Sequence, residues 1–153
     1  MRIHAMVRAA VAAAVVMGVA AGAYAQGKPR VVEMTGNDAM KFSVTSIAAK
    51  PGETLTVKLK SIGTLPKIAM AHNFVLLAAG TDAAAFANAA ATSAPTYIPA
   101  AQKAKILAMT AMAGPGETVE VTFKVPAKPG NYDFICSFPG HYLAGMKGVL
   151  VVK

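Results

Sequence analysis

Four residues of this chain carry side chains that could together bind one metal ion. Cys136, His141 and Met146 lie within eleven residues of one another near the C-terminus, and His72 lies far upstream. One thiolate, two imidazoles and one thioether form the ligand set of a mononuclear blue-copper site. The thiolate stabilises Cu(I) and bonds covalently to Cu(II), imidazole suits both oxidation states, and a weak thioether contact tunes the potential. The ligand types therefore predict a copper centre that exchanges single electrons.

The same residues also have simpler interpretations. Taken singly, Cys136 or Met146 is more often a core residue, and a lone histidine is more often a core or surface residue than a ligand. The combined Cys-x4-His-x4-Met spacing with an upstream His-Asn pair favours the metal. Structural zinc prefers four Cys or His ligands, so the thioether argues against it.

Two kinds of enzyme are further alternatives. Cys136 and His141 could form the nucleophile–base pair of a hydrolase, but the sequence offers no evident third orienting group or oxyanion helix. One domain with one cysteine and no further histidine cluster lacks the second copper centre of a multicopper enzyme. We therefore expect no enzymatic activity.

The N-terminal segment predicts export. Arg2 and Arg8 precede an uncharged apolar run over residues 9–21, which is too short to span a bilayer, and residues 23–25 form an Ala-x-Ala cleavage site. We expect residues 1–25 to be a signal peptide and residues 26–153 to form one periplasmic domain. An uncleaved membrane anchor is the alternative. Because Cys136 is the only cysteine, metal ligation would explain an unpaired thiol in an oxidising compartment.

The charge of the expected domain is basic. Without Arg2 and Arg8, 13 Lys and Arg remain, and they exceed the seven acidic residues by six. Such a balance favours anionic partners or surfaces. The basic residues are scattered and lack a cluster with stacking aromatics, so we expect no nucleic-acid binding. We also expect no stable membrane insertion of this domain.

Short alternating runs predict an all-β domain. Period-2 runs bounded by Gly and Pro are typical of an antiparallel sandwich with one buried face per strand. Ile47 breaks the alternation, which predicts a bulge or a strand end. The alternating apolar sets are Phe42 and Val44; Leu55, Val57 and Leu59; Val119, Val121, Phe123 and Val125; and Tyr132, Phe134 and Cys136, with residues 149–152 as a continuous apolar strand.

Turns and one helix interrupt this pattern. Pro51-Gly52, Pro115-Gly116 and Pro129-Gly130 each suit the central positions of a type II turn. Residues 80–105 do not alternate, and Thr81 or Asp82 could cap a short alanine-rich helix that ends near Ala91. We interpret this segment as a helical flap between strands rather than a second domain.

The ligand residues and their surroundings resemble the cupredoxins, and within them the azurin and auracyanin group. The resemblance covers nearly all of residues 26–153 and is densest in residues 35–40, 65–76 and 136–148. It implies an eight-stranded Greek-key β-sandwich (cupredoxin-like) with one type 1 copper per chain. It also implies a soluble exported one-electron carrier that shuttles electrons transiently between redox partner proteins such as cytochromes. A copper-binding protein for storage, delivery or resistance is the alternative, and a copper-free adhesion sandwich is disfavoured by the complete ligand set.

The resemblance implies roles for individual residues. Asn73 would brace the two ligand loops, and the backbone N–H of Phe138 would donate a hydrogen bond to the Cys136 sulfur. The implied equatorial ligands are His72, Cys136 and His141, with Met146 as the axial ligand. Electrons would pass through an apolar docking patch around His141 that comprises Met40, Leu65, Ala69, Met70, Phe138, Pro139, Gly140 and Leu143. For Met40 and Leu65, ordinary sandwich core is the alternative.

The chain departs from azurins in three respects. Azurins usually have glycine before the first ligand histidine, whereas this chain has Ala71, so a carbonyl ligand at that position is an open question. The spacing between His141 and Met146 is that of auracyanins and exceeds that of azurins by one residue. A single cysteine also excludes the disulfide that azurins carry. The sequence therefore predicts an azurin-like domain with an auracyanin-type metal loop.

Overall fold

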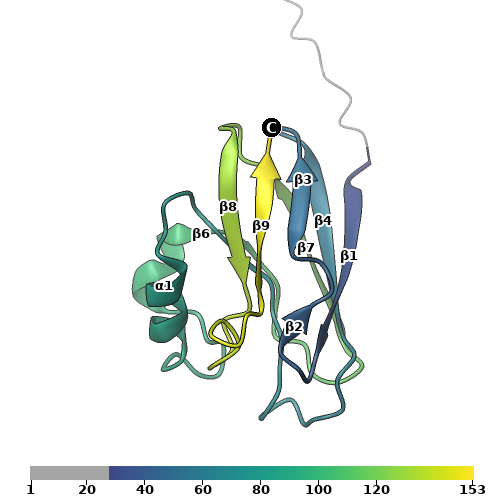
Figure 1. Ribbon diagram of the computed structural model, residues 1–153, viewed down its shortest axis with the longest axis vertical. Coiled ribbons are helices and arrows are strands. Elements are labelled where there is room, and N and C mark those ends of the chain that lie inside the picture. Colours follow the sequence, from purple (N-terminus) through teal and green to yellow (C-terminus); the bar gives the residue numbers. More distant parts are fainter. Residues whose placement is uncertain (1–27) are drawn as a thin grey trace, which may run out of the picture.

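The computed structural model describes residues 28–153, which form a two-sheet β-sandwich with one short helix at its side (Figure 1). The expected signal peptide, residues 1–25, lies outside the described residues. The strands are β1 (Arg30–Asn37), β2 (Lys41–Phe42), β3 (Ser46–Ala49), β4 (Thr54–Ser61), β5 (Val75–Leu77), β6 (Ile106–Met109), β7 (Thr118–Lys124), β8 (Gly130–Ile135) and β9 (Lys147–Val152). The helices are α1 (Ala83–Ala90) and the 3-10 helix η1 (Ala100–Lys105). Among the described residues, no helix has the length and apolarity needed to cross a membrane.

The strands divide into a four-stranded sheet of order β2-β1-β4-β7 and a five-stranded sheet of order β3-β9-β8-β5-β6. β1 and β4 are parallel, as are β3 and β9, and the remaining pairs are antiparallel. The predicted all-β, cupredoxin-like sandwich with a short helix is confirmed. Residues 28–153 form nine strands where eight were expected, because the two-residue β2 is separate from β3.

The break in alternation at Ile47 marks a change of sheet. Phe42 lies in β2 of the first sheet, and Ile47 lies in β3 of the second. Both side chains enter the same core from opposite layers, with 5% and 4% of their surface exposed. The odd number of residues between them arises because the chain crosses from one sheet to the other. The predicted strand end is therefore confirmed.

The flap covers the outer face of the five-stranded sheet (Figure 1). The Asp82 side chain accepts a hydrogen bond from the Ala85 N–H at 3.0 Å, so the predicted cap and helix are confirmed. Phe86 of α1 packs with Val75 and Ile135 in a second small apolar cluster. This packing buries both faces of β5, which explains why its three residues are all buried without alternation.

Two of the three predicted type II turns are confirmed. Gly52 and Gly116 have φ of 72° and 77°, and the Glu53 and Glu117 N–H groups donate to the Lys50 and Gly114 carbonyls. The third prediction is wrong. Gly130 has φ of 151° and is the first residue of β8, where it pairs with Val152 of β9.

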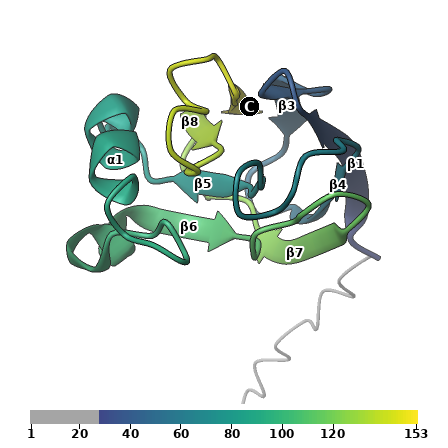
Figure 2. The ribbon, with the colours of Figure 1, turned by 90° about the horizontal axis from the view of Figure 1, so that it is seen from below.

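The two ends of the sandwich differ in what they carry. The C-terminus and the start of β1 lie at the upper end in Figure 1. The long connections over residues 62–74 and 136–146 lie at the lower end, onto which Figure 2 looks directly. The candidate ligands all belong to these two connections. The fold thus brings segments more than sixty residues apart in the chain to one end of a rigid frame.

Candidate metal centre

Three of the four predicted ligand side chains meet at one point. The ligand atoms of His72, Cys136 and His141 all lie within 4.8 Å of one another. The Cys136 sulfur lies 3.4 Å from Nδ1 of His141, and the two imidazole rings have centroids 5.1 Å apart. None of the three is more than 1% exposed, and Met146 is fully buried. The site is therefore a small enclosed cluster of soft and borderline ligands.

His72 is held by the backbone rather than by its ring. Its N–H donates to the Ala113 carbonyl at 3.0 Å, and its carbonyl accepts from the Ala113 N–H at 2.7 Å. Both ring nitrogens are buried without a hydrogen-bond partner. Buried imidazole nitrogens normally have partners, so this ring is left to bind something from outside the chain.

The second connection forms a compact loop that begins where β8 ends. The Cys136 N–H donates to the Met146 carbonyl at 3.0 Å, and the Met146 N–H donates to the His141 carbonyl at 2.9 Å. The His141 N–H donates to the Phe138 carbonyl at 3.1 Å. These bonds fix three ligand residues relative to one another, because the first closes the base of the loop and the other two form turns within it.

Asn73 joins the two connections. Its Oδ1 accepts from the Ser137 N–H at 2.8 Å, and its Nδ2 donates to the Ser137 hydroxyl at 2.9 Å. Asn73 and Ser137 are both 1% exposed. Asn73 follows His72 and Ser137 follows Cys136, so these two buried hydrogen bonds join the two ligand loops, as predicted for Asn73. Ser137 was not singled out from the sequence.

Burial sets the protonation of the three groups. It raises the pKa of the Cys136 thiol to about 12, while the backbone N–H groups of Asn73 and Phe138 act in the opposite direction. Burial lowers the pKa of His141 to about 4, with the neighbouring His72 as a second cause, and burial also lowers the pKa of His72. Both imidazoles are therefore neutral at pH 7 and have lone pairs available for a metal.

The residues present fit a copper ion. A cation would satisfy the unpartnered His72 nitrogens and would stabilise the Cys136 thiolate, which burial alone disfavours. The donor set of two imidazoles, one thiolate and one thioether suits copper better than zinc. His72, Cys136, His141 and Met146 are arranged as a single copper site. The Ala71 carbonyl oxygen lies 3.9 Å from the Cys136 sulfur, which places it beside the ligands.

The structure adds Gly36 to the site, which the sequence did not single out. A Cβ atom on this β1 residue would lie 2.8 Å from the Met146 methyl carbon and 3.0 Å from the His72 ring. Glycine therefore lets the first strand approach two ligands at once. A glycine inside a strand pattern was the available signal, since such a residue often marks a close approach.

A row of aromatic rings also leads from the flap to His141. The Phe138 ring lies 4.8 Å from the His141 ring and 5.0 Å from the Tyr97 ring, centroid to centroid. Phe138 is 8% exposed and Tyr97 is partly exposed. Phe138 therefore packs mainly inward against the ligand, and the flap contributes Tyr97 as an aromatic neighbour, which was not predicted from the sequence.

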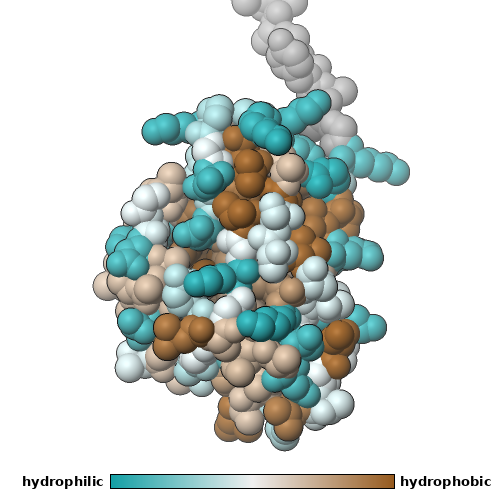
Figure 3. Space-filling view, viewed as in Figure 1, coloured by the Kyte–Doolittle hydropathy of each residue, from teal (hydrophilic) through white to brown (hydrophobic). Residues whose placement is uncertain are grey.

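The predicted docking patch lies at the same end of the molecule, but its residues differ widely in solvent exposure. Leu143 and Leu65 are 76% and 44% exposed, and the neighbouring Ile68, which was not predicted, is 90% exposed. Apolar side chains gather at this lower end of the molecule in Figure 3. Of the remaining predicted residues, Ala69 and Gly140 are exposed, Met40, Met70 and Pro139 are partly exposed, and Phe138 is buried.

The sandwich and its ligand set define a copper protein with one type 1 site. The chain belongs to the plastocyanin/azurin family of copper-binding proteins, whose sequence model matches residues 30–153.

Individual relatives agree with this assignment. The chain is 44% identical over 117 residues to auracyanin-B of Chloroflexus aurantiacus, which covers 75% of this chain but only 48% of that protein, so the chain spans about half the length of that relative. It is 39% identical over 125 residues to azurin of Pseudomonas denitrificans, with 80% and 97% covered. The structure of reduced auracyanin from Roseiflexus castenholzii superposes with a TM-score of 0.72 at 34% identity, with 83% and 99% covered.

Proposed function

We propose that this protein is an exported one-electron carrier of the azurin and auracyanin type and not an enzyme. The observation that carries the proposal is the buried cluster of His72, Cys136 and His141, with Met146 beside it, on the frame of a plastocyanin/azurin family member. A related structure bears the description of a "blue" copper protein, and another is described as dithionite-reduced, which supports a redox role. Bound copper would supply a single-electron couple, Cu(I)/Cu(II).

The residues of the chain hold and shield that couple. The backbone bonds of His72 to Ala113 and of Cys136 to Met146 fix the ligand loops on strand ends, so the site changes little when one electron is added or removed. Hydrogen bonds from the Asn73 and Phe138 N–H groups to the sulfur would tune the potential. Burial of all four ligands excludes water from the site.

Electrons would enter and leave through the end of the molecule that carries His141. Its exposed apolar side chains, led by Leu143, suit brief contact with a larger redox protein, since interfaces between transient redox partners are small. Cytochromes or other donors and acceptors in the periplasm would be such partners. Complete burial of the ligands also favours a carrier over a copper store, because a store must give its ion up to an acceptor.

The first test is the visible absorption and EPR spectrum of the protein after Cu(II) loading, beside the Cys136→Ser variant. We expect an intense thiolate-to-copper charge-transfer band and a narrow copper hyperfine splitting, both lost in the variant because oxygen replaces sulfur. A colourless wild-type protein, or a spectrum indifferent to Cys136, would contradict the proposal. Electron self-exchange between oxidised and reduced protein then separates the two functions, since a carrier exchanges fast and a store does not.

A further inference from the structure

Six basic side chains gather at the end of the sandwich opposite the ligands, and we call this set the basic pole. Its members are Lys28, Arg30, Lys50, Lys124, Lys128 and Lys153, all exposed. Strand pairing places them together: Arg30 lies opposite Leu55, Lys124 lies opposite Thr54, and the Lys153 N–H donates to the Ala49 carbonyl. Hydrophilic side chains gather at this upper end in Figure 3, on both sides of a narrow apolar strip.

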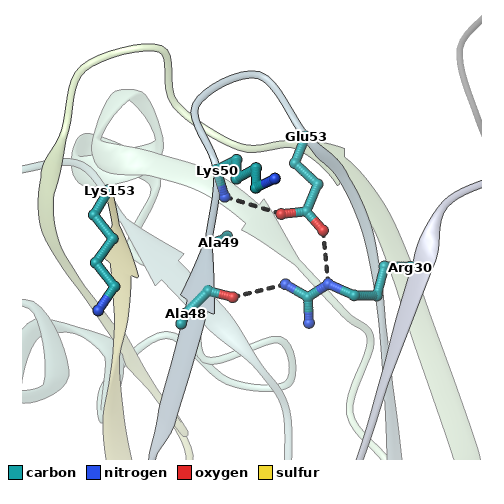
Figure 4. A pocket seen from close by; sticks show the side chains of 6 residues that line it. All are labelled: Arg30, Ala48, Ala49, Lys50, Glu53 and Lys153. Atoms are coloured by element: carbon teal, nitrogen blue, oxygen red, sulfur yellow. Dashed lines mark hydrogen bonds and ion pairs between the residues drawn. The ribbon is translucent and has the colours of Figure 1, made fainter.

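The charge of the basic pole is largely uncompensated. A shallow pocket of about 550 Å³ lies within it, and Glu53 is the one acidic side chain that lines this pocket (Figure 4). Glu53 is already engaged, since it accepts from Arg30 Nε at 2.6 Å and from the Lys50 backbone N–H at 2.9 Å. Within residues 28–153, the ammonium groups of Lys50, Lys124, Lys128 and Lys153 form no ion pair.

We propose that the basic pole binds the surface of an anionic phospholipid bilayer. Clusters of four to eight Lys and Arg side chains are typical of surfaces that bind anionic lipid, because each adds electrostatic attraction to a negatively charged surface. Lysine is depleted at protein–protein interfaces, which depend on aromatic and apolar anchors. Nucleic-acid binding uses stacking aromatics, whereas Tyr132, whose hydroxyl donates to the Lys128 carbonyl, is only 4% exposed.

The geometry gives this contact a consequence for the copper site. Since the basic pole and the ligand loops lie at opposite ends of the sandwich, a protein bound through the pole turns its ligand end away from the bilayer. The apolar side chains around His141 then face the aqueous side, where a redox partner can reach them. The membrane contact itself needs no copper, so it can be tested separately from the electron-carrier proposal.

The test is co-sedimentation of the purified protein without its expected signal peptide, residues 26–153, with vesicles of phosphatidylglycerol and phosphatidylcholine, compared with phosphatidylcholine alone. We expect binding to the anionic vesicles that falls steeply with added salt. The double variant Lys50→Gln/Lys153→Gln should bind about 25-fold more weakly, since each basic residue contributes about fivefold at such a surface. A second variant, Lys124→Gln/Lys128→Gln, should show a similar loss.

The matched control is Lys103→Gln/Lys105→Gln, which removes the same charge from exposed positions on η1. We expect it to bind nearly as well as wild type. Equal losses in all variants would show an effect of net charge alone and overturn the proposal. Equal binding to phosphatidylcholine would overturn it too, as would displacement by inorganic phosphate beyond that by chloride at equal ionic strength. The unfolding midpoint of each variant checks that it is folded.

Discussion

At the scale of single residues, burial of the ligand side chains is unfavourable unless a metal ion is bound. The Cys136 thiolate is disfavoured, and the two His72 ring nitrogens are left without partners. Each of these features would be a defect in an ordinary core, because buried polar groups are normally satisfied. Together these features describe a preformed site in which a bound cation would satisfy the buried ligand atoms.

The Asn73 bridge leads to a prediction about stability. Asn73→Ala removes two buried hydrogen bonds and leaves the Ser137 N–H unpaired, so we expect the free energy of unfolding to fall by about 2–3 kcal/mol. Ser137→Ala removes only the bond to the hydroxyl and should cost about 1 kcal/mol. Denaturant unfolding of both variants measures the difference. Equal losses would mean that the bond to the Ser137 N–H contributes nothing.

At the scale of elements, loops at one end bear the ligands while the strands supply rigidity. Cys136 directly follows β8, and Met146 directly precedes β9, so two paired strands set the span of the metal loop. The flap with α1 packs on the outer face of the five-stranded sheet and sends Tyr97 toward Phe138 beside the site. The helix thus supports the copper end indirectly, through the second apolar cluster.

The α1 cap permits a matched comparison of two neighbouring positions. Asp82→Ala removes the acceptor for the Ala85 N–H, so we expect a loss of about 1 kcal/mol in the free energy of unfolding. Thr81, which the sequence offered as the alternative cap, does not cap the helix, and Thr81→Ala should change stability by less than half as much. Chemical denaturation tests both, and a larger loss at Thr81 would contradict the assignment.

At the scale of the whole molecule, the two ends of the sandwich have different chemistry. One end is apolar around buried ligands, and the other is basic. Arg30 ties the two sheets together at the basic end. From β1 of the four-stranded sheet it pairs with Glu53 and donates to the Ala48 carbonyl of β3 in the five-stranded sheet at 2.7 Å.

This tie predicts a pH dependence. Hydrogen bonds from Arg30 and from the Lys50 N–H lower the pKa of Glu53 from its ordinary value of 4.5. A carboxylate with a lowered folded-state pKa stabilises the protein above its unfolded-state pKa, and this contribution is lost as pH falls through the folded-state pKa. Because the pair is partly exposed, we expect Glu53→Gln to cost only about 0.5 kcal/mol at pH 7.

Urea unfolding of wild type and Glu53→Gln at a series of pH values checks this expectation. The difference between the two proteins isolates Glu53, since all other titrations are common to both. It should be constant from neutral pH down to about 5 and should shrink below about 4.5. A difference that grows on acidification would contradict the sign of the effect.

The sequence by itself determined the chemistry of this protein. Cys136, His141 and Met146 are close in the chain, and alternation, two Pro-Gly turns and the Asp82 cap are local patterns, so residue types and spacing were enough to predict them. Local patterns were not enough where a distant strand or a very short element decides the structure. Pro129-Gly130 suits a turn by composition, but its place opposite Val152 is set by β9, which lies far along the chain. The two-residue β2 is too short to show a period.

The tertiary structure decided what depends on contacts between distant segments. Only packing shows that Gly36 must lack a side chain beside His72 and Met146, that Ser137 completes the Asn73 bridge, or that Tyr97 packs edge-on against Phe138. Only strand pairing gathers basic residues scattered from Lys28 to Lys153 at the end opposite the ligands. Periodicity carries information over a few residues, whereas these features arise where two sheets and their loops meet.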